Sequence, residues 1–325
     1  KSIIIATGST PVIPVAWNEF AEHIITTDEI FELEELPASM AVIGLGSIGL
    51  EIGQALSRLG VEVTGVDQLE VIAQLQDPVV NKCTIEVIGR EFPLWLGTAA
   101  QLEKVDNGIR VTCGDKEVIV EKVFASLGRK PNLDKLGLDK LPVEMDGRGI
   151  PVYDRLTMQV GNLPIFIAGD VNADVAILHE AGHEGRVAGY NASRKEATAF
   201  KRKTQLGITF CDPNIATVGA QLGELNQADI AIGEIQFGPV GRALIIGKNR
   251  GVLRIYVQRS NGQLLGAAMA CVKGENLAHL LAWSVQQELT VFDLLKMPFY
   301  HPVIEEALQG ALYSVLGELE IKQDL

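Results

Sequence analysis

Short runs of β-branched and other apolar residues alternate along this chain with glycine-rich turns and amphipathic stretches. Residues 40–43 form one such run, and the sequence Gly-Leu-Gly-Ser-Ile-Gly follows it at residues 44–49. Beyond this turn the apolar side chains recur at helical spacing, which predicts a helix that buries the stripe Ile48, Ile52, Leu56 and Leu59. Gly60 ends that predicted helix, and residues 61–66 predict a second strand. Strand, helix and strand in this order predict a parallel α/β sheet.

The middle of the chain extends this pattern. Residues 109–113 and 118–120 predict two strands, which could form an antiparallel insertion. Proline, asparagine, aspartate and glycine are frequent in residues 129–162, which predicts a loop-rich crossing segment. Residues 165–168 predict a strand that ends in a Gly-Asp turn, and we expect the helix after it to run for about four turns.

The last third of the chain has a different pattern. Residues 206–272 are rich in β-branched positions, and turn signals separate them at regular intervals, so a mostly antiparallel sheet is expected. Amphipathic helices are expected near residues 275–288 and 304–316. This segment therefore predicts a separate α+β domain.

The chain opens on a predicted strand. Residues 1–8 predict a buried β-branched strand that ends in glycine, as the strand at residues 165–168 does, and we expect both to join one sheet. The sequence begins with lysine and not with an initiating methionine. We therefore expect it to be the C-terminal portion of a longer protein.

Composition and charge narrow the class of protein. The chain has 325 residues, of which 47% are hydrophobic, and this suffices for two or three domains with buried cores. A net charge of −13 opposes non-specific binding to nucleic acid or to a membrane surface. No apolar run reaches the roughly 18 residues of a membrane span and no signal peptide is recognised, so we expect a cytoplasmic protein. The four cysteines lie far apart, without the spacing of a disulfide framework or a metal site.

The turn at residues 44–49 has the spacing of a dinucleotide-binding motif. Its first glycine makes the tight turn, its second lets a pyrophosphate approach the backbone, and its third lets the helix pack on the strand. The free N–H groups and the partial positive charge of the helix N-terminus attract phosphate. The predicted cofactor-binding residues in this turn are Gly44, Gly46, Ser47, Ile48 and Gly49.

The acidic residue at the end of the second strand indicates which dinucleotide binds. Asp67 lies 23 residues after Gly44, and its carboxylate can accept hydrogen bonds from the adenosine ribose while it repels a 2′-phosphate. The next three residues offer no cation for such a phosphate. We therefore expect NAD rather than NADP.

A second candidate site lies near the end of the chain. His301 is followed by Pro302, and Glu306 comes five residues after the histidine. A histidine held by a carboxylate can move protons near neutral pH. The alternative is an ordinary turn with a solvated glutamate in the first turn of a helix.

With these motifs, the sequence resembles the pyridine nucleotide-disulfide oxidoreductases, and among them the dihydrolipoamide dehydrogenases. The matching segments follow the order of the family: residues 3–9 (IIIATGS), 42–53 with Asp67, 128–132 (GRKPN), 165–171 (IFIAGDV) with 179–185, and 301–306. The resemblance implies a Rossmann-like NAD domain inserted into a partial FAD domain, and an α+β dimerisation domain after them. The implied bounds are 1–35 and 128–205 for the FAD domain, 36–127 for the NAD domain, and 206–325 for the dimerisation domain.

The resemblance also implies a flavin site. It places FAD at Gly128, at the Gly169-Asp170 turn, where Asp170 would bond a ribityl hydroxyl, and at the helix N-terminus near Ala181. Glu51 matches a family position near the contact of nicotinamide and flavin, where it pairs with an upstream lysine. From the residues alone, Gly169-Asp170 is an ordinary turn and Glu51 is an exposed helix residue.

The same resemblance gives His301 and Glu306 their chemistry. His301 would be the acid/base group for a substrate thiol, which attacks only as a thiolate, and Glu306 would orient it. In this family the histidine serves the flavin site of the other subunit, which implies a homodimer. The implied reaction passes electrons from a dithiol, such as protein-bound lipoamide, through an upstream cysteine pair and FAD to NAD.

Departures from the family leave alternatives open. The FAD-binding GxGxxG and the CxxxxC that precede residues 3–9 in the family are not in this sequence, and Phe299 and Tyr300 stand where small or polar residues are commoner. The alternatives are a soluble pyridine nucleotide transhydrogenase, which needs no thiol base, another NAD(P)H:FAD disulfide reductase, and a non-catalytic remnant that serves as a scaffold.

Overall fold

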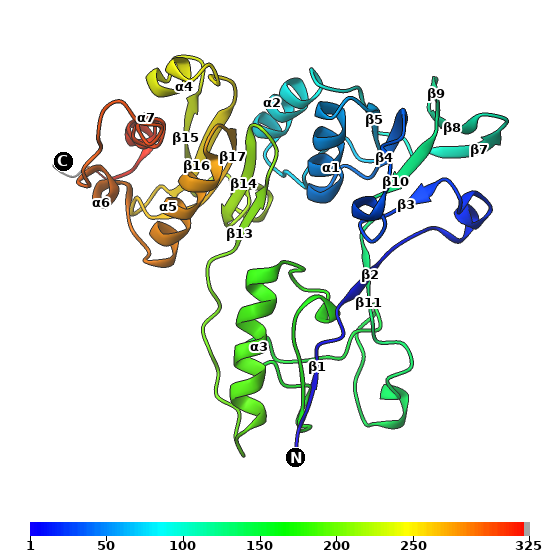
Figure 1. Ribbon diagram of the computed structural model, residues 1–325. Coiled ribbons are helices and arrows are strands. Elements are labelled where there is room, and N and C mark those ends of the chain that lie inside the picture. Colours follow the sequence, from blue (N-terminus) through cyan, green and yellow to red (C-terminus); the bar gives the residue numbers. More distant parts are fainter. Residues whose placement is uncertain (322–325) are drawn as a thin grey trace. The chain divides into compact units, whose positions relative to one another are not determined.

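The computed structural model describes residues 1–321 and divides into two compact units (Figure 1). The smaller unit comprises residues 1–14 and 127–202, and the larger one comprises residues 15–126 and the chain from Lys203 onward. The sequence-based boundaries, at residues 35, 127 and 205, place residues 15–35 in the FAD domain together with residues 1–14. In the structure, residues 15–35 belong to the larger unit instead. The domain boundaries stay a prediction.

The smaller unit contains the two strands that end in glycine. β1 (Ile3–Ile5) pairs in parallel with β12 (Ile165–Ile167), which confirms that these segments join one sheet. β2 (Ser9–Pro11) pairs antiparallel with β11 (Arg129–Pro131), and α3 (Leu178–Ala192) packs against β12. The expected burial of the first strand is wrong, since Ile3 and Ile4 are 57% and 44% exposed. Within the described residues β1 pairs only with β12, so no second strand lies along its other edge.

The larger unit begins with a parallel sheet. Its order is β3-β10-β4-β5-β6, and every pairing is parallel. An antiparallel three-stranded sheet, β7-β8-β9, is inserted before β10, so the predicted parallel core and antiparallel insertion are confirmed. The strands are β3 (Ile24–Ile25), β4 (Ser39–Ile43), β5 (Glu62–Asp67), β6 (Leu94–Leu96), β7 (Gln101–Val105), β8 (Gly108–Cys113), β9 (Lys116–Val120) and β10 (Lys122–Ala125).

Helices α1 (Ser47–Arg58) and α2 (Pro78–Ile88) connect strands of this sheet. α1 buries only part of the stripe that hydrophobic periodicity predicted: Leu56 is buried and Ile52 is half-buried, but Ile48 is 37% and Leu59 is 67% exposed. The buried face also contains Leu50 and Gly53. A Cβ on Gly53 would lie 3.3 Å from the ring of Phe92, so α1 approaches its neighbours through a glycine and not through its most apolar side.

The C-terminal part of the larger unit is an antiparallel sheet with the order β13-β14-β17-β16-β15, as expected for an α+β domain. Its strands are β13 (Leu206–Thr209), β14 (Asn214–Gly219), β15 (Ile230–Gln236), β16 (Val252–Gln258) and β17 (Leu264–Cys271). Its helices are α4 (Gly241–Ile245), α5 (Gly274–Gln286), α6 (Val291–Leu295) and α7 (Glu306–Val315). Short 3-10 helices within residues 1–321 lie at Val15–Phe20, Ile30–Glu32, Leu138–Lys140, Asp170–Asn172, Leu222–Glu224 and Leu316–Glu318.

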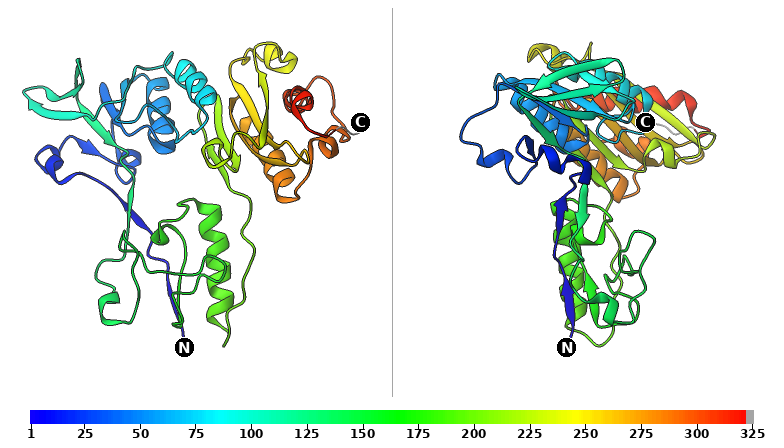
Figure 2. Two further views of the ribbon diagram at one scale, coloured as in Figure 1. Left: turned by 180° about the vertical axis from the view of Figure 1, so that it is seen from behind. Right: turned by 90° about the vertical axis from the view of Figure 1, so that its right-hand side faces the viewer.

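Alternate residues of β16 face two different cores, as the period of a strand requires. Leu253 and Ile255 belong to the core formed with α5 and α7. Val252 and Tyr256 belong to the core that contains Val80 of α2. The antiparallel sheet therefore lies between α5 and α7 on one face and α2 on the other, and the left view of Figure 2 shows this layering. Among residues 1–321, no helix is both long and apolar enough to span a bilayer.

Candidate functional site

The glycine-rich turn joins β4 to α1 in the conformation that the motif requires. Gly44 has φ +96°, in the left-handed region that favours glycine. Gly46 is the N-cap residue of α1, and a Cβ there would meet nothing within 4 Å. A Cβ on Gly49 would lie 1.9 Å from the carbonyl oxygen of Gly44, so only glycine lets the helix start this close to the turn. The turn thus leaves space at Gly46 and none at Gly49.

Asp67 lies beside this turn at the end of β5. Its Oδ2 accepts a hydrogen bond of 2.7 Å from the N–H of Leu45, and its Oδ1 accepts one of 2.9 Å from the N–H of Leu69. A carboxylate has about four lone-pair positions, so two backbone bonds leave it able to accept more. Asp67 therefore holds the turn in place, a role that the sequence did not show, and keeps the capacity to bind a ribose.

Ser47 and Glu51, both predicted as cofactor-binding residues, contact the C-terminal part of the larger unit. Thr209 donates a hydrogen bond of 2.7 Å from its Oγ1 to the Oγ of Ser47. The N–H of Phe210 donates one of 2.7 Å to the Oε1 of Glu51. Neither contact was visible in the sequence, because the partners lie more than 150 residues apart.

The Gly169-Asp170 turn of the smaller unit follows β12. Gly169 has φ +79°, and a Cβ there would lie 3.3 Å from the Cβ of Ala181 on α3. The Oδ2 of Asp170 accepts a hydrogen bond of 2.9 Å from the hydroxyl of Ser9, which in turn accepts one of 2.8 Å from Arg129. Gly128, next to Arg129, has φ +92°. The turn is thus tied to the strand at residues 9–11 and to helix α3.

The sequence analysis did not single out Glu184 of α3, whose side chain hydrogen-bonds to this turn. Its side chain is fully buried, and its Oε2 accepts hydrogen bonds from the N–H of Gly169 at 2.8 Å and from the Nδ2 of Asn172 at 2.7 Å. Arg202 supplies the counter-charge at 2.7 Å. An acidic residue in the middle of the helix predicted after the Gly-Asp turn was the available signal, but its partners come from other segments of the chain.

His301 and Glu306 form the second predicted site. The Nδ1 of His301 lies 2.8 Å from the Oε1 of Glu306, and the His301 side chain is 80% exposed. The N–H of Val303 donates to the other carboxylate oxygen at 3.0 Å. The His301 hydrogen bond is the main cause that lowers the pKa of Glu306, which keeps its carboxyl ionised. The His301-Pro302 peptide is cis.

The four cysteines are all free thiols, and each is buried or half-buried, which does not favour a nucleophilic thiolate. Burial raises the pKa of Cys211 to about 12, and it also raises the pKa values of Cys83, Cys113 and Cys271. Since only a thiolate attacks a disulfide, these thiols are poor candidates for a redox centre. Within the described residues, no cluster of three or more histidine, cysteine or acidic residues could hold a metal ion.

Comparison with known proteins places the fold and these motifs in one family. Residues 1–193 match the model of the pyridine nucleotide-disulphide oxidoreductases, and residues 206–312 match the dimerisation domain of the same family. The chain belongs to this family, whose members are oxidoreductases that use FAD and NAD(P)H.

Two relatives and one solved structure show which members of the family this chain is similar to. The chain is 31% identical to dihydrolipoyl dehydrogenase 2 of Haloarcula marismortui, over 97% of this chain and 68% of that protein. It is also 31% identical to a mercuric reductase of Staphylococcus aureus, over 90% of this chain and 55% of that protein. The flavoprotein disulfide reductase RclA of Escherichia coli has the same fold, with a TM-score of 0.85 at 20% identity over 97% of this chain and 73% of that one.

The residues of the two turns fit the cofactors of the family. Gly46 leaves open space at a helix N-terminus, which suits the pyrophosphate of a dinucleotide. The carboxylates of Asp67 and Asp170 lie at turns and are only partly exposed, positions from which each can accept hydrogen bonds from a ligand hydroxyl. The structure gathers Gly44, Gly46, Gly49 and Asp67 in the larger unit, and Gly128, Gly169, Asp170 and Ala181 in the smaller one.

Proposed function

We propose that this protein oxidises a dithiol to a disulfide and reduces NAD, as an enzyme of the dihydrolipoamide dehydrogenase type. The overall change is that the dithiol and NAD⁺ become a disulfide, NADH and a proton. When bound, FAD and NAD supply the hydride chemistry. The observation that carries the proposal is the exposed His301 held by Glu306.

His301 is suited to receive the proton of the substrate thiol. A carboxylate of Glu306 accepts hydrogen bonds only, so the Nδ1 of His301 is the donor between them. This leaves Nε2 as the acceptor on the exposed side of the ring. A thiol of ordinary pKa, about 8.5, is mostly protonated at neutral pH, and transfer of its proton to Nε2 releases the reactive thiolate. Glu306 fixes the orientation of the ring and stabilises the cation that forms.

The preference for NAD over NADP belongs to the same proposal. Asp67 stands beside the glycine-rich turn, where its negative charge repels a 2′-phosphate. Gln68, Leu69 and Glu70 follow it and bring no cation. Protein-bound lipoamide is one dithiol that such a site could oxidise. The redox-active cysteine pair of the reaction is not among the four buried or half-buried cysteines of this chain.

The proposal is tested by the formation of NADH from dihydrolipoamide and NAD with the complete flavin-loaded protein. Replacing His301 with glutamine keeps a hydrogen-bonding side chain but removes the base, so we expect the rate to fall by about 10²- to 10⁴-fold. The matched control is His279→Gln, an exposed histidine whose ring contacts the backbone oxygen of Glu275 and the ring of Trp283 and is held by no carboxylate in the described residues. NADP is assayed in parallel and is expected to be the poorer acceptor.

Two further readouts separate the alternatives. Reduction of the flavin by NADH without any thiol does not use the base, so it should be equal in His301→Gln and in the unsubstituted protein. If the rate of dihydrolipoamide oxidation were undiminished in His301→Gln, His301 would not be the base for the substrate thiol. A transhydrogenase, by contrast, needs no thiol base. No turnover with any dithiol, despite normal flavin reduction, would favour the transhydrogenase.

A further inference from the structure

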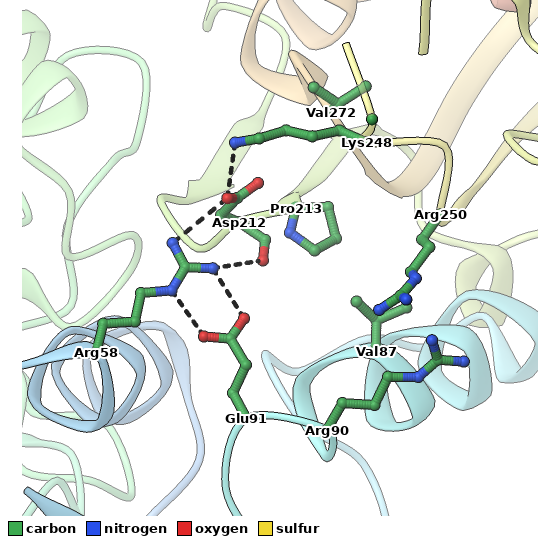
Figure 3. A pocket seen from close by; sticks show the side chains of 10 residues that line it. Arg58, Val87, Arg90, Glu91, Asp212, Pro213, Lys248, Arg250 and Val272 are labelled. Atoms are coloured by element: carbon green, nitrogen blue, oxygen red, sulfur yellow. Dashed lines mark hydrogen bonds and ion pairs between the residues drawn. The ribbon is translucent and has the colours of Figure 1, made fainter. Parts of the chain in front are cut away.

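A pocket of about 320 Å³ lies in the larger unit, between the ends of α1 and α2 and the loop at residues 247–250 (Figure 3). Its volume is near the lower end for small-molecule sites, which span roughly 300 to 1,000 Å³. Four cations and two carboxylates line it: Arg58, Arg90, Lys248, Arg250, Glu91 and Asp212. The pocket is therefore locally positive in a chain whose net charge is −13.

Two of the four cations, Arg58 and Lys248, form ion pairs with the two carboxylates. Arg58 donates to both oxygens of Glu91 at 2.7 and 2.8 Å and lies 3.3 Å from Asp212. Lys248 lies 2.8 Å from the same oxygen of Asp212. Burial acts to raise the pKa of Asp212, but Lys248 and Arg58 outweigh it and hold that pKa below its ordinary value. Both carboxylates are thus neutralised within this group of four side chains.

Arg90 and Arg250 are left without a counter-charge. Neither guanidinium forms a hydrogen bond or an ion pair with any residue from 1 to 321, and Figure 3 shows the two groups pointing toward one another beside Val87. Both side chains are exposed, so water screens part of their repulsion, and an anion between them would neutralise it. The planar donors of two arginines match a phosphate or another oxyanion, because each can donate two parallel hydrogen bonds.

We propose that this pocket binds a phosphorylated small molecule, with its phosphate between Arg90 and Arg250. Val87, Pro213 and Val272 line the same pocket and supply apolar contacts for the carbon skeleton of the ligand. The site is separate from the proposed NAD site. The glycine-rich turn is at the beginning of α1 and Arg58 is at its end, roughly 16 Å away along the helix axis.

The test is isothermal titration calorimetry of the complete protein with inorganic pyrophosphate. The buffer keeps the ionic strength constant with sodium chloride, and saturating NADH occupies the glycine-rich turn. We expect saturable binding, and we expect the double variant Arg90→Gln/Arg250→Gln to bind at least about tenfold more weakly. Arg242→Gln is the control, because Arg242 is exposed on α4, outside the pocket, and should leave the affinity unchanged.

Each outcome bears on the proposal. Equal affinity in the double variant would place any bound pyrophosphate elsewhere, and the absence of saturable binding in the unsubstituted protein would overturn the site. The heat of NADH binding is measured separately in the same instrument. A failure of the NAD proposal is therefore recognised independently of the phosphate result.

Discussion

Gly46 and Gly49 stand three residues apart in one motif, yet the structure gives them different reasons to be glycine. Gly46 has φ −70° and open space around its Cα, so alanine fits its backbone without strain. Gly49 has no such space, because a Cβ would lie 1.9 Å from the carbonyl oxygen of Gly44. The first is constrained by the ligand that we expect at the turn, and the second by the packing of the helix on the turn.

This difference predicts that two alanine substitutions separate binding from stability. Gly46→Ala should leave the melting temperature unchanged but weaken NAD binding at least about tenfold, or about 1.4 kcal/mol, since the methyl group occupies the approach of the pyrophosphate. Gly49→Ala should lower both the melting temperature and the affinity for NAD, because the backbone must move to make room for the methyl group. The measurements are calorimetric melting and titration with NADH. Gly147→Ala is the control, at a glycine with open space in an exposed loop. A lowered melting temperature for Gly46→Ala would contradict this account.

Helix α1 connects the dinucleotide motif to the antiparallel sheet. Ser47, Glu51 and Gln54 are each hydrogen-bonded to a residue between 209 and 212, and Arg58 reaches Asp212 as well. These side chains lie three or four residues apart and so form one stripe along the helix. The sequence predicted α1 and its length, but of the stripe that hydrophobic periodicity predicted only Leu56 is fully buried. Its polar stripe is a contact surface, and only the distant partner residues reveal this.

The ion pairs at the end of this stripe predict a pH dependence of stability. A carboxyl whose folded pKa lies below its ordinary value stabilises the fold above that value, and this contribution is lost as the pH falls through the folded pKa. Asp212, with an ordinary pKa of 3.8, is such a group. Asp212→Asn should therefore lower the free energy of unfolding by up to about 1 kcal/mol at pH 7, the upper range for exposed ion pairs.

The loss in Asp212→Asn should shrink as the pH falls below about 4, where the carboxyl of the unsubstituted protein becomes protonated. Melting temperatures between pH 3 and pH 7 measure this difference. Asp139→Asn, at an exposed aspartate without an ion pair in the described residues, should show little change at any pH. A difference that stays constant down to pH 3 would show that the charge of Asp212 is not the cause.

At the scale of the whole molecule, the match of residues 206–312 to a dimerisation domain supports a homodimer. We propose that His301 acts on the flavin site of the partner subunit. This arrangement makes each reaction centre depend on the glycine-rich turn of one chain and on the histidine of the other. Two impaired variants, one with each defect, could then restore one complete centre in a mixed dimer.

Co-expression of Gly46→Ala with His301→Gln tests this arrangement. In random dimers half of the molecules are mixed, and each mixed dimer has one intact centre of two, so about a quarter of the full NADH-forming rate is expected. Each variant expressed alone is the control, assayed at subsaturating NAD: His301→Gln should be nearly inactive, and Gly46→Ala should keep no more than about a tenth of the rate. If His301 served its own subunit, the mixed dimers would gain nothing, and a rate no higher than that of the single variants would exclude the shared site.

Local signals in the sequence determined most of the elements and the candidate residues for the chemistry that we propose. Periodicity, glycine spacing and the separation of His301 from Glu306 depend on neighbours within about one or two turns of chain, and such features are legible without a fold. The tertiary structure decided which faces are buried, how Glu184 holds the turn at Gly169, and that Arg90 and Arg250 converge on one pocket. These features join residues far apart in the chain, and only folding brings their side chains within the few ångströms over which hydrogen bonds and charges act.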